Sequence, residues 1–137
     1  MRQGIQTNYP DERLKKWGCY FFALMQWAER ITGQNQQDYA VNLMREAERL
    51  ALISPEIDIL KPVDLLNFFI GGYPSIRFTS CEFRKEPPDN QIRYIVCLKK
   101  PNYMHFVLSD EGEIWDALDP ARPSAKDYRP DSYRVFL

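Results

Sequence analysis

Residues 15–27, KKWGCYFFALMQW, place two lysines, a tryptophan and a Gly-Cys pair directly before a strongly apolar run. From Cys19 onward, apolar side chains recur at intervals of three and four residues, which predicts an amphipathic helix over residues 19–31. Its apolar positions are Phe21, Leu24, Met25, Ala28 and Ile31. Gly33 is a natural terminator for this helix. The stretch therefore predicts a long helix that carries a cysteine in its first turn.

Two further helices are predicted after this one. The second is expected over about residues 37–52, with the charged side chains of REAER (45–49) on its solvated face. Pro62 suits the first turn of a third, short helix, which is expected to end at Gly71-Gly72. The first half of the chain is thus predicted to be helical.

Beyond Gly72 the chain is rich in β-branched and aromatic residues. Turn-prone segments (EPPDN, KPN and DEG) divide this part into a predicted meander of antiparallel strands over residues 76–85, 91–99, 103–109 and 113–118. A proline-containing loop over residues 120–130 precedes SYRVFL (132–137), which is expected to form a last strand. The fold class predicted is α+β, with N-terminal helices packed on a C-terminal antiparallel β-sheet, and the length predicts a single domain over residues 1–137.

The composition argues against some classes of binding partner. Eighteen Lys and Arg residues balance 19 Asp and Glu residues, and no basic block stands out, which argues against a nucleic-acid partner. The N-terminal segment lacks the apolar core of a signal peptide, and no apolar run approaches the ~20 residues of a membrane helix. We therefore expect no membrane partner and a cytoplasmic location, with delivery by a phage or a secretion system as the alternative. Three cysteines without a CxxC pair and a single histidine predict no disulfide framework, no metal site and no cofactor.

The single histidine, His105, lies within the predicted strand YMHFVLS (103–109). Strand alternation places His105 and Val107 on one face and Phe106 and Leu108 on the other. The imidazole is therefore expected to point away from the more hydrophobic face of the strand.

The following hairpin determines which carboxylate reaches this histidine. If Glu111 and Gly112 form a two-residue turn, Val107 opposes Asp116, and the carboxylate lies on the His105 side. A longer turn or a bulge would reverse this parity and favour Asp119. A carboxylate beside an imidazole orients the ring and stabilises its cation, as a general base requires.

Cys19 is the best-placed nucleophile for such a pair. A thiol in the first turn of a helix feels the positive end of the helix dipole, which favours the thiolate. Gly18 before it is expected to permit close approach of a substrate and an unusual backbone angle. Cys81 and Cys97 lie within predicted strands without an activating neighbour, and we interpret them as structural thiols.

Four features together resemble the papain-like cysteine peptidase superfamily, in particular its small bacterial and phage members of the bacteriocin-leader-peptidase (C39-like) kind. The features are Gln6, Trp17-Gly18-Cys19 at the start of an apolar helix, MHFVL, and IWDALDP. The resemblance implies Cys19 as nucleophile, His105 as base, Asp116 as its orienting residue and Gln6 as an oxyanion-hole donor. Trp17 and Gly18 would contact substrate.

The chain also departs from the family in three ways. Bulky aromatic residues follow Cys19 where the family often has small ones, and they are expected to narrow the cleft. The Asp-Pro pair of the family matches Asp119-Pro120, so Asp119 remains open as the orienting residue. Gln6 lies 13 residues before Cys19, and its alternative interpretation is a solvated polar residue.

The resemblance implies a cysteine-dependent hydrolase that cleaves an amide or peptide bond of a peptide or protein substrate through a thioester. Two alternatives stay open. The fold could serve a binding or assembly protein without activity, or the same triad could run an acyltransferase in which an amine replaces water.

Overall fold

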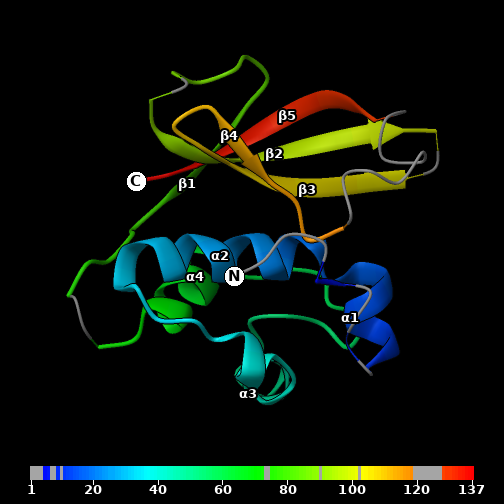
Figure 1. The fold of residues 1–137 in the computed structure, drawn as a ribbon, viewed down its shortest axis with the longest axis vertical. Helices are drawn as coiled ribbons and strands as arrows, with labels where there is room; N and C mark the ends of the chain where they lie inside the picture. The colour runs from blue at the N-terminus through cyan, green and yellow to red at the C-terminus, as the bar shows by residue number, and fades with distance from the viewer. Residues whose placement is uncertain are drawn as a thin grey trace.

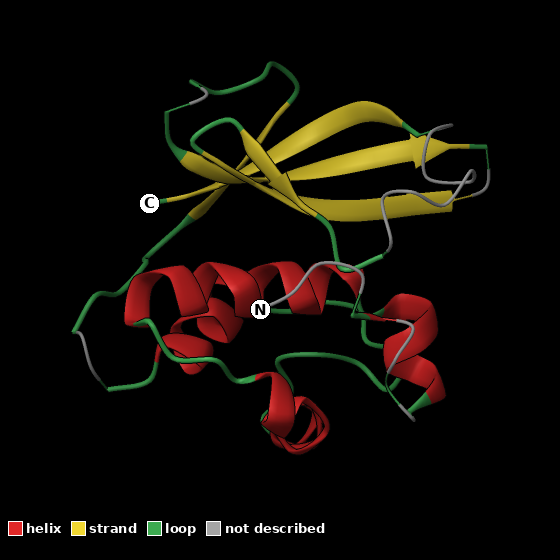
Figure 2. Cartoon of the chain, viewed as in Figure 1, coloured by secondary structure: helices red, strands yellow, loops and turns green. Residues whose placement is uncertain are grey.

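The computed structural model describes residues 5, 6, 9, 11–72, 75–89, 91–101, 103–118 and 128–137. It has two layers, with helices on one side and an antiparallel sheet on the other (Figures 1 and 2). The α+β prediction, with N-terminal helices and a C-terminal sheet, is therefore correct. None of the helices in the described ranges has the length and apolar character needed to cross a bilayer.

The first two helices meet at Gly18. The short helix α1 (Glu12–Trp17), absent from the prediction, is capped by Asp11, whose carboxylate accepts a hydrogen bond from the backbone N–H of Arg13 at 2.8 Å. The long helix α2 (Cys19–Thr32) begins where the periodicity predicted and ends one residue later, against Gly33 with φ 74°. Cys19 is thus the first residue of α2.

The next helical region differs from its prediction. In place of one helix over 37–52, a 3₁₀ turn η2 (Gln37–Tyr39) leads into α3 (Ala40–Arg49). The helix ends early because Ala51 adopts φ 58°, outside the helical region. The predicted third helix is confirmed as α4 (Pro62–Ile70), with Pro62 in its first turn and Gly71 as its C-cap.

The sheet has five strands in the order β1-β5-β2-β3-β4, all antiparallel, where a simple meander was predicted. The consecutive strands β2, β3 and β4 do form a meander. The last strand, however, inserts between β1 and β2, so the prediction that the first two strands pair is wrong. The bounds are β1 (Cys81–Arg84), β2 (Arg93–Lys100), β3 (Tyr103–Asp110), β4 (Glu113–Trp115) and β5 (Arg129–Phe136).

Strand lengths also differ from the prediction. The expected strand 76–85 is confined to Cys81–Arg84, and the strand expected over 132–137 begins earlier, at Arg129. Pro130 within β5 faces Leu98 of β2 next to a register shift between Cys97 and Leu98, where a missing N–H is tolerated. The expected loop 120–130 therefore ends at least two residues sooner, and its residues 120–127 lie outside the described ranges.

Helix α2 lies between α4 and the sheet and is buried over most of its length (Figure 1). Phe21 meets Phe69 of α4 edge-on, with ring centroids 5.0 Å apart, and Trp27 meets Phe136 of β5 at 5.2 Å. The aromatic residues after Cys19, expected to narrow the cleft, instead mostly fill this core, because Phe21 and Phe22 are completely buried. Burial on two opposite sides explains why so few residues of α2 are polar.

Gly18 has a different role in the backbone from the one expected. Its angles are φ −81° and ψ 1°, which any residue can adopt, so the prediction of an unusual backbone angle is wrong. What excludes a side chain is space. A Cβ atom at Gly18 would lie 2.6 Å from the backbone oxygen of Leu14 and 3.1 Å from the ring of Phe22.

Substitution Gly18→Ala should therefore lower the free energy of unfolding by about 1–3 kcal/mol, because the α1–α2 junction has to open to admit the methyl group. Urea denaturation measures this. Gly72→Ala is the matched control, since a Cβ there meets nothing within 4 Å and Gly72 has no positive φ. Equal stability of the two variants would contradict the steric explanation.

Candidate active site

The β3–β4 hairpin has the predicted geometry. Its register pairs Leu108 with Trp115 and Asp110 with Glu113, and its two turn residues, Glu111 and Gly112, have φ 51° and 86°. Positive φ at both positions is the signature of the tight turn that suits a two-residue hairpin. The parity that carries Asp116 to the His105 side is therefore confirmed.

His105 and Asp116 form a buried pair. Nε2 of His105 lies 2.6 Å from Oδ1 of Asp116, and only 2% of the His105 side chain is exposed. The same Oδ1 accepts a hydrogen bond from the backbone N–H of Leu118 at 2.9 Å, which fixes the carboxylate. Asp119, the alternative partner, lies outside the described residues.

The thiol of Cys19 lies close enough to the same imidazole to raise the pKa of the ring. Because Nε2 is taken by Asp116, Nδ1 is the nitrogen available to the sulfur. Cys19 is half-buried at the first position of α2, a helix of 14 residues. The structure thus brings a thiol, an imidazole and a carboxylate into one line, with the ring in the middle.

The environment of His105 favours its protonated form. Burial alone would lower the pKa of the ring, but the hydrogen bonds to Asp116 and Cys19 and their charges outweigh burial and raise the pKa to about 9. The imidazole therefore holds its proton at neutral pH. This is the charge state that an adjacent thiolate would need.

Gln6 is buried beside this line, with 1% of its surface exposed, so the interpretation of a solvated residue is wrong. Its backbone N–H donates to the carbonyl of Ala117 at 2.7 Å, and its side-chain Nε2 donates to the carbonyl of Lys15 at 3.0 Å. In a continuous helix the Lys15 carbonyl would accept from the N–H of Cys19. Gln6 therefore lies at the N-terminal end of α2 and is held there by the residue that follows Asp116.

A cleft of about 640 Å³ opens at Cys19. Its wall includes residues from six elements of both layers, among them Trp17, Tyr20, Phe83, Met104, Phe106 and Arg134. Trp17, predicted to contact substrate, lines this cleft and is 46% exposed. The structure does not bring Gly18 to the wall, because Gly18 is buried against Leu14 and Phe22.

Arg134 and the aromatic residues of β1 and β3 were not found from the sequence as parts of a site. Strand alternation is the sequence signal that could have grouped some of them, because Cys81 and Phe83 are two residues apart and lie on one face of β1. The register that pairs Phe83 with Arg134 depends on the insertion of β5, which the sequence did not reveal.

The other two cysteines lack an imidazole neighbour. Cys97 is buried, whereas Cys81 is half-buried and lines the same cleft as Cys19. Burial raises the pKa of both thiols above the usual range, which makes them poorer nucleophiles. Within the described ranges no three His, Cys, Asp or Glu residues cluster as ligands for a metal.

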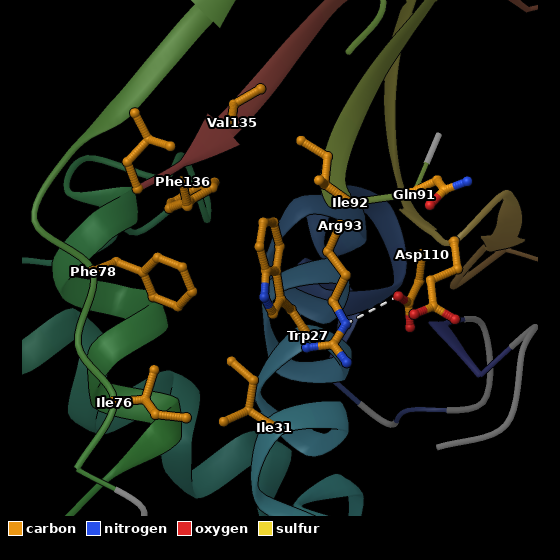
Figure 3. A pocket seen from close by; sticks show the side chains of 12 residues that line it. Trp27, Ile31, Ile76, Phe78, Gln91, Ile92, Arg93, Asp110, Val135 and Phe136 are labelled. Atoms are coloured by element: carbon orange, nitrogen blue, oxygen red, sulfur yellow. Dashed lines mark hydrogen bonds and ion pairs between the residues drawn. The ribbon is translucent and has the colours of Figure 1, made fainter. Parts of the chain in front are cut away.

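A second depression, of about 430 Å³, lies at the other end of α2 (Figure 3). Trp27, Phe78 and Phe136 form its apolar wall, and an ion pair between Arg93 and Asp110 at 3.0 Å lies at its rim. None of its lining residues is a cysteine, serine, threonine or histidine, so it offers no nucleophile. The cleft at Cys19 is therefore the better candidate for an active site.

Fold and site together define an α+β protein in which a histidine is hydrogen-bonded to an aspartate and lies close to a cysteine beside an open cleft. By its sequence the chain belongs to the family described as "Protein of unknown function, DUF261", which matches residues 3–137. A search of curated proteins found no match to the chain. A search of solved structures found none either.

The raised pKa of His105 predicts a pH-dependent stability. Since the folded pKa is about 9 against an ordinary 6.5, the stabilisation is complete below about pH 6.5 and is lost as pH rises through about 9. We expect this contribution to be on the order of 3 kcal/mol. Urea unfolding at several pH values in this range should show the fall in the free energy of unfolding.

The matched variant for this measurement is His105→Gln. Its free energy of unfolding should fall much less than that of the parent protein as pH rises. The thiols of Cys81 and Cys97 also destabilise the fold at high pH, because the unfolded chain ionises them more readily. The difference between the two curves therefore isolates His105. Parallel curves for the parent protein and His105→Gln would show that the pair with Asp116 does not hold the proton.

Proposed function

We propose that this protein is a cysteine-dependent hydrolase that cleaves an amide or peptide bond, with a papain-like arrangement of its site. The observation that carries the proposal is His105, which pairs with Asp116 at 2.6 Å and lies close enough to Cys19 for the thiol to raise the pKa of the ring. A buried histidine has two ring nitrogens, and each needs a polar partner. Here the second neighbour is a thiol at an open cleft, which is what nucleophilic catalysis requires.

The reaction proceeds through a thioester. His105 holds the proton of Cys19, and the sulfur attacks the carbonyl carbon, so that a C–S bond forms and the carbonyl π electrons move to oxygen. When the carbonyl re-forms, the C–N bond breaks and His105 transfers its proton to the leaving amine. Water then attacks the thioester with His105 as base, which releases the acid and regenerates the thiol.

Asp116 acts through the ring. Its carboxylate accepts the Nε2–H of His105, which fixes the tautomer and stabilises the imidazolium. The hydrogen bond from Leu118 holds that carboxylate in place while the proton moves on the other side of the ring. Asp116 is therefore a positioning residue in this mechanism.

Gln6 and the backbone N–H of Cys19 would stabilise the oxyanion. The Gln6 amide carries two N–H donors, of which one donates to the Lys15 carbonyl, and the other would donate to the oxyanion. Support for this role comes from the position of that carbonyl, which is the one that a continuous helix would pair with the N–H of Cys19. Both donors thus belong to the same end of α2.

The papain-like likeness is supported by the order and placement of these groups. The cysteine begins the central helix, and the histidine and aspartate lie on β3 and directly after β4, which pair in the sheet. The glutamine lies upstream of the cysteine and donates to the carbonyl of Lys15 in α1, which directly precedes the cysteine's helix. Because the cleft is bounded by both layers, an extended peptide could lie across the end of α2.

The proposal predicts selective alkylation of Cys19. With iodoacetamide at mildly acidic pH, Cys19 should react at least tenfold faster than Cys81 or Cys97, measured by mass spectrometry of peptides, because only Cys19 has an imidazolium neighbour. His105→Gln should remove the difference. Cys81 is a stringent control, since it lines the same cleft. Slow, equal labelling of all three thiols would indicate an inactive binding protein instead.

Replacement of Gln6 separates the oxyanion role from a role in folding. Gln6→Ala should slow acylation of Cys19 by a 4-nitrophenyl ester about a hundredfold, the usual effect of losing one oxyanion donor. Alkylation of Cys19 by iodoacetamide should keep its rate, because that reaction forms no oxyanion. If Gln6→Ala slows both reactions equally, the glutamine only supports the local structure.

A further inference from the structure

Arg134 lies in the wall of the cleft that contains Cys19. It is in the middle of β5, where its register partners are Phe83 of β1 and Ile95 of β2. Ile95 belongs to the main core, so Arg134 is on the face of the sheet that looks toward the helices. A long cation therefore lies on the face of the sheet that packs on the helices.

The guanidinium is held by aromatic rings. Its central carbon lies 4.2 Å from the ring centroid of Phe83 and 5.8 Å from that of Phe106. One nitrogen, Nη1, donates to Oγ of Ser132 at 2.9 Å. These contacts fix the plane of the guanidinium, and within the described residues they use one of its five N–H donors.

Arg134 differs from the other arginines buried to a similar extent. Arg13, Arg30, Arg84 and Arg93 each pair with a carboxylate in the described part of the chain. No carboxylate of the described residues pairs with Arg134. A half-buried cation that stacks on an aromatic ring and pairs with no described carboxylate suits recognition of a carboxylate, which a guanidinium can bind through two parallel hydrogen bonds.

Side-chain contacts connect this cation to the nucleophile. The ring of Tyr20, the residue after Cys19, stacks on Phe106 with centroids 4.3 Å apart, and Phe106 in turn neighbours Arg134. The two other charged residues of the wall, Lys16 and Asp58, come from the helical layer and form no ion pair with Arg134. A peptide lying in the cleft from Cys19 along Phe106 would bring a carboxylate to Arg134.

We propose that Arg134 makes the cleft selective for substrates that carry a carboxylate close to the bond that is cleaved. This inference rests on the proposed hydrolase function and names its substrate class as acidic peptides. The carboxylate is either an aspartate or glutamate side chain or the C-terminus of the peptide. The exposed side chains of Phe83 and Met104 provide apolar surface beside the carboxylate site.

The test uses protection of cleft thiols, so that it requires no turnover. Pools of acetylated, amidated hexapeptides with one glutamate at a varied position are compared with pools in which glutamine replaces it. A third pool of neutral peptides with free C-termini is compared with its amide. The measured quantity is the peptide concentration that halves the rate of iodoacetamide labelling at Cys19 and at Cys81.

We expect one carboxylate-bearing pool to halve the labelling rate at a peptide concentration at least about tenfold lower than its neutral match needs. A difference of this size is what a charge-assisted hydrogen bond gives. Arg134→Gln should abolish the difference, and Arg134→Lys should retain part of it. Arg84→Gln, outside the cleft wall, is a control that should keep it, and thermal unfolding checks that each variant is folded. The pool that shows the preference identifies the source of the carboxylate.

Equal protection by matched pools, or a preference that survives Arg134→Gln, would overturn the carboxylate site. Failure of the hydrolase proposal has a different signature, because Cys19 would then label no faster than Cys81. In that case Cys81, which lines the same cleft, still reports whether carboxylates bind.

Discussion

The burial of α2 between α4 and the sheet is the constraint on which the other features depend. A helix enclosed on two sides cannot slide or rotate without disrupting the packing of Phe21 against Phe69 and of Trp27 against Phe136. Its first residue is therefore fixed relative to β3. Cys19 meets His105 because the core holds the helix in this position, while the loops near the site only complete the arrangement.

Much of the helical layer could be predicted because its signals are local. The start of α2, its end at Gly33 and the extent of α4 follow from periodicity and from Gly and Pro positions. The split of the 37–52 segment and the short α1 were missed, since both depend on capping and on single residues such as Ala51. The insertion of β5 was missed because strand order depends on long-range packing that alternation in one strand does not encode.

The candidate site could likewise be predicted where its signals are local, but not where they depend on long-range packing. Asp116 was placed correctly beside His105 because a two-residue hairpin fixes parity, and parity is a local property. Cys19 was singled out by its position at the start of a helix. Gly18 was misjudged, since its requirement comes from the carbonyl of Leu14 and the ring of Phe22, which only the packed structure brings near. Arg134 could not be found without the strand order that carries it to the cleft.

The position of β5 has a consequence for how the protein is made. Residues 129–136 come after every other strand in the chain, yet they lie inside the sheet and join β1 to β2. During synthesis on the ribosome, β1 therefore has no partner strand until this segment emerges from the exit tunnel. The wall that holds Arg134 is assembled at the same moment, so a nascent chain cannot bind ligand in that cleft before residues 129–136 have emerged.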